Sequence, residues 1–309
     1  MARLRGAAAL LFPVFFGAAL LFFPDVSATA AREGVTLCLQ TVLPSLFPFF
    51  VLSSLLVQSD VPRLLSRAMA GVMYPLFGVS GAGASALILG LLGGYPVGAR
   101  TVAELYGRGE IAREEAEQLL AFCNNSGPGF FLGVCGTAVF GSARAGAYLY
   151  LIHVGAALVT GVLLRRDLGL PRRKAVSRQR APFDLAAALP AAVQSSFAAV
   201  GSVSAFVIFF MVLLRLLSLV PALAALPPLP RAALFGFMEM TNGVNALPAT
   251  RTGFVLCAAI MNWGGLSVQA QTRAMLAGSA LSARRCVIGK AVQALAGVPL
   301  ALLAAQRLF

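Results

Sequence analysis

The chain has 309 residues, of which 59% are hydrophobic and only 11% are charged, with a net charge of +13. A soluble domain usually carries about 25% charged residues, so the composition excludes a soluble domain and indicates an integral membrane protein. The five cysteines are scattered without C-x-x-C spacing, and the single histidine, His153, is expected to pack mid-span, so we expect no metal site, disulfide framework or cofactor.

The first two apolar segments predict membrane spans. Arg3 and Arg5 precede a run from Gly6 to Phe23, and residues 28–30 resemble a signal-peptidase site. The run is longer than the core of a usual signal peptide, so we expect an uncleaved transmembrane or signal-anchor segment with a cytoplasmic N-terminus. A second span is expected over about Gly34 to Val57.

The stretch from Met69 to Gly98 is apolar but crowded with glycine and proline, which predicts a re-entrant hairpin rather than a straight span. If this stretch crossed the membrane, the basic loop that follows Leu164 would lie outside, against the positive-inside rule. A helix with a polar break follows over about Glu115 to Phe140, and a clear span runs from Ala145 to Leu164.

The second half repeats this order of elements. The basic loop leads into an amphipathic segment, Pro182 to Val193, and then into a span that ends at Leu217. A glycine-rich apolar hairpin over Arg231 to Pro248, an interrupted helix over Gly253 to Gly278 and a last span to about Gln306 complete the chain. The seven basic residues of the loop are Arg165, Arg166, Arg172, Arg173, Lys174, Arg178 and Arg180.

This order of elements predicts an all-α polytopic membrane protein with two inverted repeats, each with a re-entrant hairpin and an interrupted transmembrane helix. Seven full crossings would place the C-terminus outside. Paired, interrupted apolar segments at corresponding positions point to the binding site of a transporter. The expected units are an N-terminal anchor segment (1–33), a first repeat (34–165), a basic cytoplasmic loop with its lead-in (166–192) and a second repeat (193–309).

Both interrupted helices carry polar residues at their breaks. Asn124, Asn125 and Ser126 precede a Gly-Pro-Gly turn in the first, and Asn262 and Trp263 precede two glycines in the second. The proline lacks an N–H, so the helix must open there, and the freed backbone groups are tolerated only beside protein or a water-filled cavity. We predict that these five residues bind substrate. The alternative is a kinked helix whose asparagines bond to neighbouring helices.

The tip of the first hairpin, G-G-Y-P-V-G, exposes backbone amides that can hold an anion. Tyr95 can stack on an aromatic ring, and Arg100 is a fair partner for an anion. The alternatives are a tyrosine that anchors the interface and an orientation charge at the membrane edge. The binding residues predicted at this tip are Gly94, Tyr95, Pro96, Gly98 and Arg100.

Glu239 lies within the apolar second hairpin, where a carboxylate is costly and usually has a purpose. Three roles are open to it: pairing with Arg100, accepting a proton, or binding a donor on the substrate. Its neighbours Thr241, Asn242 and Asn245 are predicted to bind substrate as well. Capping and turn chemistry within the hairpin is the alternative for these three.

The motifs of both halves resemble those of a known family. They are G-G-Y-P-V-G-A-R-T-V-A-E-L-Y-G-R-G-E-I with E-E-A-E-Q-L-L-A-F-C-N-N-S-G-P-G-F in the first half and G-F-M-E-M-T-N-G-V-N in the second. Over roughly residues 40–300 the chain resembles the sporulation integral membrane proteins of the YlbJ (SpoVV) family. The resemblance implies a nucleoside-recognition (Gate) domain, an architecture similar to concentrative nucleoside transporters, and an endospore-forming source. It also implies movement of dipicolinic acid from the mother cell across the outer forespore membrane.

We therefore expect a membrane transporter for dipicolinate, a planar aromatic dianion, with a nucleoside as the alternative substrate. A non-transporting scaffold for membrane assembly is a further alternative, although the soluble segments are short. We do not expect an enzyme, because no nucleophile–base pair or metal set is visible. The expected partners are the small molecule and the lipid bilayer, not nucleic acid. A coupling ion, Na⁺ or H⁺, and a homo-oligomer are both left open by the sequence.

Overall fold

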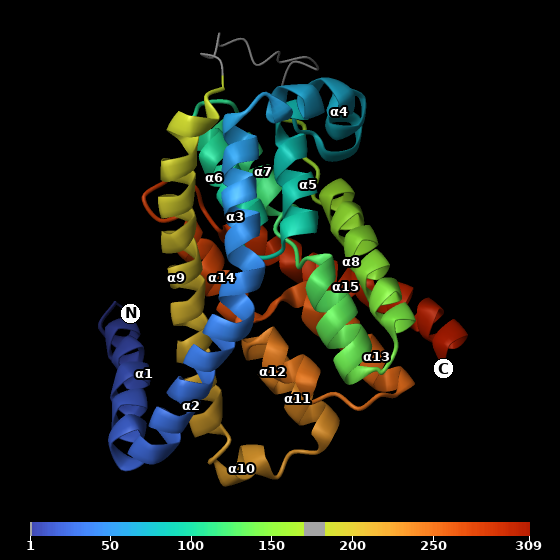
Figure 1. Cartoon of the computed structure of the whole chain (residues 1–309). Helices are drawn as coiled ribbons and strands as arrows, with labels where there is room; N and C mark the ends of the chain where they lie inside the picture. Colours follow the sequence, from blue (N-terminus) through green and yellow to red (C-terminus); the bar gives the residue numbers. More distant parts are fainter. Residues whose placement is uncertain (1, 170–182) are drawn as a thin grey trace.

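The computed structural model describes residues 2–169 and 183–309. Within these two ranges every regular element is a helix and there is no strand, which confirms the predicted all-α architecture (Figure 1). Most of the predicted basic loop, from residue 170 to 180, lies outside the described residues. Four segments are long and apolar enough to cross a bilayer: α8 (Ala143–Leu163), α9 (Leu185–Leu217), α13–α14 (Arg251–Met275) and α15 (Arg284–Leu308).

Two further pairs of helices pass the same length and composition test together, although each pair is bent at a short break. The first is α1 (Ala2–Phe22) with the helix that begins at Pro24, and the angle between them is 101°. The described part of the chain therefore holds four candidate spans, or up to six if each bent pair is one span. The seven crossings and the side of the C-terminus stay predictions.

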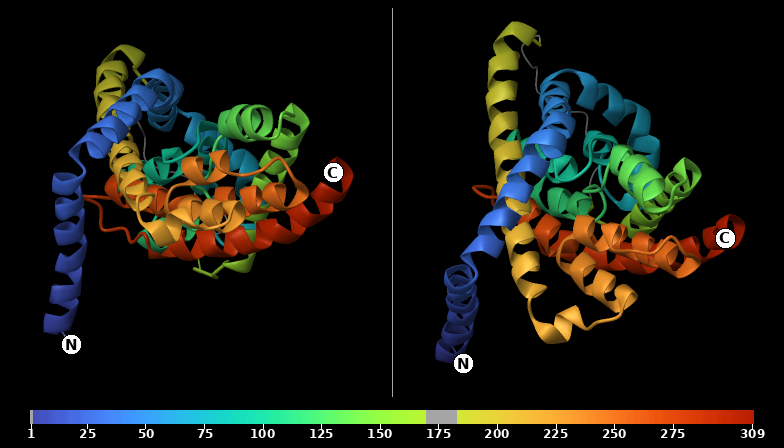
Figure 2. Two further views of the ribbon diagram at one scale, coloured as in Figure 1. Left: turned by 90° about the horizontal axis from the view of Figure 1, so that it is seen from below. Right: turned by 60° about the horizontal axis from the view of Figure 1, so that its bottom comes forward.

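The second predicted span starts earlier than expected. The chain is helical from Pro24 to Gln58, and its consecutive segments are α2 (Pro24–Leu37), η1 (Cys38–Val42) and α3 (Leu43–Gln58). The expected start at Gly34 is wrong because Pro24 occupies the first helical position, where its fixed φ favours a helix start, and Asp25 complements the helix dipole. α1 stands away from the rest of the bundle (Figure 2) and touches α9 through ring contacts of Phe12 and Phe16 with Phe209.

The first re-entrant hairpin consists of α5 (Ala84–Gly93) and α6 (Val97–Gly107), which meet at a tip around Gly94. The expected stretch, Met69 to Gly98, covers the end of α4, a bent junction and α5, and the tip lies where the sequence placed it. The start of that range belongs to α4 (Val61–Phe77), a separate helix turned by 102° from the segment that contains α5. α4 ends at Gly78, whose φ of 67° suits glycine and breaks the helix.

The first interrupted helix has the predicted form. α7 (Arg113–Leu120) ends before an irregular segment, and η3 (Phe130–Val139) continues the path on the far side. The irregular residues run from Ala121 to Gly127, and Pro128 begins the next helical turn, where a missing N–H costs nothing.

The second half begins with α9, a continuous helix of 33 residues. The amphipathic lead-in expected up to Val193 is therefore not a separate element, since Asp184 already caps α9 by accepting from the N–H groups of Ala186 and Ala187. The helices that follow are α10 (Pro221–Ala224), α11 (Pro228–Met238), α12 (Met240–Asn245), α13 (Arg251–Trp263) and α14 (Gly265–Met275). α11 and α12 form the second hairpin.

The two halves have opposite orientations, as predicted. In Figure 1 the first hairpin, α5 and α6, occupies the upper half of the bundle beneath α4, whereas the second hairpin, α11 and α12, occupies the lower half above α10. Each hairpin is followed in the chain by an interrupted helix and then by a long span, α8 or α15. The inverted arrangement brings both breaks to the middle of the bundle, against α8 and α15.

Candidate functional site

The first break is a hydrogen-bonded junction. The side chains of Asn124 and Asn125 are fully buried. Asn124 donates through Nδ2 to Thr272 Oγ1 of α14 (2.8 Å), and its Oδ1 accepts from the backbone N–H of Ala99 in α6 (3.3 Å). Asn125 donates through Nδ2 to the carbonyl of Phe122 (2.7 Å) and so satisfies a carbonyl at the end of its own helix. The break is thereby tied to the first hairpin and to the second half.

In the second break Asn262 bonds to an earlier backbone carbonyl, as Asn125 does in the first. Its Nδ2 donates to the carbonyl of Ala258 (2.8 Å), one turn back in α13. Two glycines, Gly264 and Gly265, with φ of 81° and 85°, then interrupt the helix between α13 and α14, and other residues rarely adopt this backbone conformation. The Oδ1 of Asn262 lies 2.8 Å from His153 Nδ1 on α8. Because a carbonyl oxygen only accepts, His153 donates from Nδ1.

Gln293 of α15 joins the two breaks. Its Nε2 lies 3.0 Å from Asn125 Oδ1 and 3.1 Å from Asn262 Oδ1, and it can donate one N–H to each. The other ring nitrogen of His153, Nε2, accepts the backbone N–H of Ser126 (3.1 Å). With both ring nitrogens so engaged, His153 is the neutral tautomer that carries its proton on Nδ1. We call the following residues the central network: Asn125, Ser126, His153, Asn262, Lys290 and Gln293.

Lys290 is the one cation of the central network, and its side chain is 0% exposed. Its Nζ donates to Gln293 Oε1 (2.7 Å) and to Asn125 Oδ1 (3.1 Å), and it lies 5.0 Å from the centre of the Tyr95 ring. All three partners are neutral, and no carboxylate of residues 2–169 or 183–309 forms an ion pair with it. Burying an ammonium group without a counter-charge costs several kcal/mol, which marks Lys290 as a functional position.

The tip of the first hairpin contributes Tyr95 to this region. Its hydroxyl donates to the carbonyl of Met261 (3.4 Å), so the side chain reaches from the first hairpin to the second interrupted helix. Pro96, joined to Tyr95 by a cis peptide bond, is the cap residue of α6. The tip therefore places an aromatic ring beside the buried ammonium group of Lys290, where a cation–π contact stabilises the charge.

Glycines let this tip lie directly on the first break. A Cβ on Gly98 would lie 2.1 Å from the carbonyl oxygen of Cys123, and one on Gly94 would lie 3.1 Å from the backbone nitrogen of Gly127. Gly94 also has a φ of 83°. Of the predicted residues, Gly94, Tyr95, Pro96, Gly98, Asn124, Asn125, Ser126 and Asn262 are thus brought together.

Arg100 belongs to a different environment. Its Nε donates to Glu104 (2.9 Å), and its terminal nitrogens donate to the hydroxyls of Ser195 and Ser196 on α9 (2.9 and 3.3 Å). The guanidinium group also lies 5.5 Å from the centre of the Phe50 ring. The charge of Arg100 is already paired, so its contacts fix α6 against α3 and α9. Its predicted role as an anion partner stays a prediction.

Glu239 forms the tip of the second hairpin and does not pair with Arg100, so that one of its three open roles is not seen. Its carboxylate accepts from the backbone N–H of Thr241 (3.0 Å) and from both the backbone and the side-chain nitrogen of Asn242 (2.8 Å each). It therefore caps α12, a role that the sequence reading had not assigned to Glu239. A role for Glu239, Thr241 and Asn242 in binding substrate stays a prediction.

The remaining predicted residues lie at the periphery. Asn242 and Asn245 line a cavity of 510 Å³ between α9 and the second hairpin, together with Arg231. Trp263 donates its indole N–H to the carbonyl of Phe237 (2.9 Å) and stacks on that ring, with centroids 5.2 Å apart. None of the bonds described for these side chains reaches the central network.

Sequence reasoning missed Lys290 and Gln293, and it assigned His153 to helix packing alone. The signal for Lys290 was present, since R-R-C-V-I-G-K-A-V-Q-A places a lysine and a glutamine three residues apart inside an apolar span. Charged residues within a span face the bundle interior and mark functional sites. Which polar group His153 meets depends on tertiary contacts with Ser126 and Asn262, which spacing along the chain does not encode.

Comparisons with known proteins agree with this architecture. Residues 39–214 match the Gate family, described as nucleoside recognition. The chain is also 30% identical over 302 residues to the sporulation integral membrane protein YlbJ of Bacillus subtilis (strain 168), a match that covers 86% of this chain and 74% of that protein. No solved structure matches the chain. The chain is therefore an integral, multi-pass membrane protein that belongs to the Gate nucleoside-recognition family and is related to the sporulation protein YlbJ.

Proposed function

We propose that this protein is a transporter that moves a small anionic aromatic metabolite, dipicolinate, out of the mother cell across the outer forespore membrane during sporulation. The observation that carries the proposal is Lys290, a buried cation without a carboxylate partner among the described residues, placed between two broken helices. The name of the related YlbJ protein supports the setting in sporulation. On this proposal the N-terminus is cytoplasmic and the protein is not an enzyme.

The chemistry of the central network fits a planar dianion. Lys290 supplies a full positive charge, and Tyr95 supplies an aromatic face next to it. The helical segments that begin at Phe130 and at Gly265 start at the two breaks, and the positive ends of helix dipoles favour carboxylates. The side-chain oxygens of Asn125 and Gln293 now accept from Lys290, and a carboxylate would replace a neutral acceptor with a charged one.

The inverted hairpins support a mechanism of alternating access. The first hairpin lies on the first break through glycine contacts, and Gly265 of the second break lies against the second hairpin, where a Cβ would be 3.1 Å from Glu239 Cα. We infer that each hairpin closes its own side of the network, and that withdrawal of one hairpin at a time exposes the site. We also propose that the two repeats move relative to each other, and that α9 is the first helix of the second repeat.

A nucleoside is the second candidate substrate, because the matching family is described as nucleoside recognition. The amides of Asn125, Asn262 and Gln293 have the hydrogen-bonding capacity to hold a base or a ribose. A neutral nucleoside gains little from a full charge, however, and would leave the buried ammonium group of Lys290 without a counter-charge. The anion is therefore favoured over the nucleoside.

Uptake by proteoliposomes tests the proposal. Purified protein is reconstituted and offered labelled dipicolinate or labelled nucleosides, with a Na⁺ gradient, a proton gradient or neither, so that the coupling ion is identified in the same experiment. We expect uptake of dipicolinate that unlabelled dipicolinate inhibits and nucleosides do not. Uptake of nucleosides alone would establish the second candidate. Uptake of neither compound under any gradient would contradict transport and favour a scaffold for membrane assembly.

A further inference from the structure

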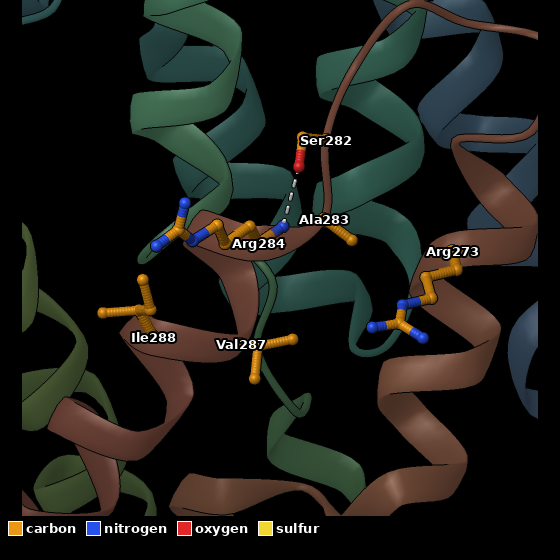
Figure 3. Close-up of a pocket in the computed structure, with 6 residues that line it drawn as sticks. All are labelled: Arg273, Ser282, Ala283, Arg284, Val287 and Ile288. Atoms are coloured by element: carbon orange, nitrogen blue, oxygen red, sulfur yellow. Dashed lines mark hydrogen bonds between the residues drawn. The ribbon is translucent and has the colours of Figure 1, made fainter. Parts of the chain in front are cut away.

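A groove between α9, α14 and α15 lies apart from the central network. Two cavities of 610 and 330 Å³ form it, and they adjoin because Arg273 and Val287 line both. The larger cavity is mainly apolar, with Phe206 and Phe210 of α9 facing Leu266 of α14. The smaller one is basic at its rim. Its lining residues are Arg273, Ser282, Ala283, Arg284, Val287 and Ile288 (Figure 3).

The arginines of the rim form no ion pair with any carboxylate in the part of the chain that the structure describes. Figure 3 shows Arg273 extending from α14 toward Val287, while the guanidinium group of Arg284 lies on the other side, near Ile288. One carboxylate is near, since Glu117 accepts from the backbone N–H of Ser282 (3.1 Å), but it is already paired with Arg113 (3.0 Å). The rim therefore carries a net positive charge.

A buried acceptor inside the groove also lacks a partner. Gln269 lines the larger cavity and is only 6% exposed. Its Nε2 lies 3.4 Å from the carbonyl of Trp263, but its Oε1 has no hydrogen-bond partner among the described residues. Buried acceptors are rarely left unpaired, so the groove calls for a ligand with a hydroxyl or N–H donor. Gln269 and Arg273 are four residues apart on α14 and thus share one face of the helix.

The groove lies between helices that belong to candidate membrane spans, α9, α14 and α15. Arg285, next to Arg284, donates to the carbonyl of Leu164 (2.8 Å), the residue at which α8 gives way to the basic segment of Arg165 and Arg166. The rim thus lies at the end of the bundle that carries the basic loop. Basic pockets between transmembrane helices at such an end bind anionic lipid headgroups.

We propose that this groove is a specific site for one anionic phospholipid, of which phosphatidylglycerol is the best fit. The phosphate contacts Arg273, with Arg284 adding positive charge from the other side of the rim, a headgroup hydroxyl donates to Gln269 Oε1, and an acyl chain lies along Phe206, Phe210 and Leu266. The site joins α9 to α14 and α15 and is independent of the transported substrate.

Lipid titration of the purified full chain tests this proposal. Phosphatidylglycerol and phosphatidylcholine with the same acyl chains are added to protein in detergent, and retained lipid is counted by native mass spectrometry. We expect the wild type to retain one phosphatidylglycerol in preference to phosphatidylcholine. Arg273→Gln should weaken retention roughly fivefold, and the double variant with Arg284→Gln roughly 25-fold, since each basic residue near an anionic lipid contributes about one fivefold step. Arg307→Gln, at the opposite end of α15, is the matched control and should retain lipid as the wild type does.

A further variant tests the proposal even if the arginine variants do not fold. Ala270→Phe fills the larger cavity without changing its charge and should abolish retention of phosphatidylglycerol. The preference for phosphatidylglycerol should also fall in Gln269→Leu. Unchanged retention in Arg273→Gln or in Ala270→Phe would overturn the proposal. So would inorganic phosphate or dipicolinate displacing the lipid at millimolar concentration, because the groove would then be a site for a soluble anion.

Discussion

Each half of the protein has a hairpin followed by an interrupted helix, but the two halves place different groups at the centre of the bundle. The first tip sends Tyr95 into the bundle, and the first break is an irregular segment with buried Asn125 and Ser126. In the second pair, Glu239 turns back to cap its own helix, and the break is made by two glycines. The first half therefore supplies the Tyr95 ring and one hydrogen-bond acceptor of Lys290, Asn125, whereas the second half supplies the other acceptor, Gln293.

The largest effect is expected where the first tip lies on its break. Gly98→Ala would place a Cβ 2.1 Å from the Cys123 carbonyl oxygen, and this overpacking should cost about 3 kcal/mol and lower the thermal midpoint in detergent. Gly133→Ala is the control, since no atom lies within 4 Å of its Cβ. In the second pair, Gly265→Ala should cost about 1–2 kcal/mol, because its φ of 85° strains any other residue. Equal midpoints for Gly98→Ala and Gly133→Ala would contradict the described contact.

The two asparagines should separate transport from stability. Asn125→Leu removes an acceptor of both Lys290 and Gln293, so dipicolinate uptake should be lost while folded protein remains in the membrane. Asn262→Leu should also abolish transport, and it should lower the thermal midpoint further. The side chain of Asn262 is packed tightly against Gly297, where even a Cβ would lie 2.3 Å from Asn262 Nδ2, so a branched leucine has little room. Uptake and detergent-solubilised melting are measured on both. Normal uptake in both variants would place the site elsewhere.

Variants of Tyr95 test the difference between the two hairpin tips, and we expect a smaller effect on dipicolinate binding. Tyr95→Leu removes the aromatic face offered to the ring of dipicolinate and should weaken its binding roughly twofold to tenfold, in line with about 0.5–1.5 kcal/mol for an aromatic pair. Tyr95→Phe keeps the ring and loses only a long hydrogen bond of 3.4 Å, so binding should change less than about twofold. Calorimetric titration measures both. If Tyr95→Phe and Tyr95→Leu behave alike, the hydroxyl and not the ring makes the contact.

Glu239 is expected to give the smallest change. Glu239→Gln keeps an acceptor at the cap of α12 but removes its charge, which should cost about 1 kcal/mol of stability and leave dipicolinate uptake intact. Melting in detergent and uptake check the two parts separately. A strong loss of nucleoside binding in this variant would instead make Glu239 a substrate acceptor, as its place in an apolar hairpin first indicated.

The sequence predicted the architecture well because the signals for it are local. Glycine and proline marked the tip at Gly94 and the break before Pro128, and charge placement predicted the inverted hairpins. It misplaced α4, since a helix that lies across the bundle and a hairpin arm have the same apolar composition. It left a pair of Glu239 with Arg100 open as one of three roles, and the structure pairs Arg100 with Glu104, one turn away on the same helix.

The site was predicted only in part, for a physical reason. Residue type marks the positions of the two breaks. At each break one asparagine, Asn125 or Asn262, donates its Nδ2 to a carbonyl three or four residues earlier. The groups that connect them, His153 and Gln293, lie on uninterrupted helices, and nothing local distinguishes them from packing residues. Only the folded bundle brings α8 and α15 against both breaks.

We propose that Lys290, and not Arg100, supplies the charge that binds the substrate. Calorimetric titration of dipicolinate into purified wild type, Lys290→Gln and Arg100→Gln tests it most directly, and each substitution removes one positive charge while keeping hydrogen-bonding capacity. A buried charge-assisted contact contributes about 1.5–3 kcal/mol. We therefore expect the affinity to fall by roughly one to two orders of magnitude in Lys290→Gln and to stay near the wild-type value in Arg100→Gln, whose charge is paired with Glu104. Unchanged affinity in Lys290→Gln, with a loss in Arg100→Gln, would contradict the account.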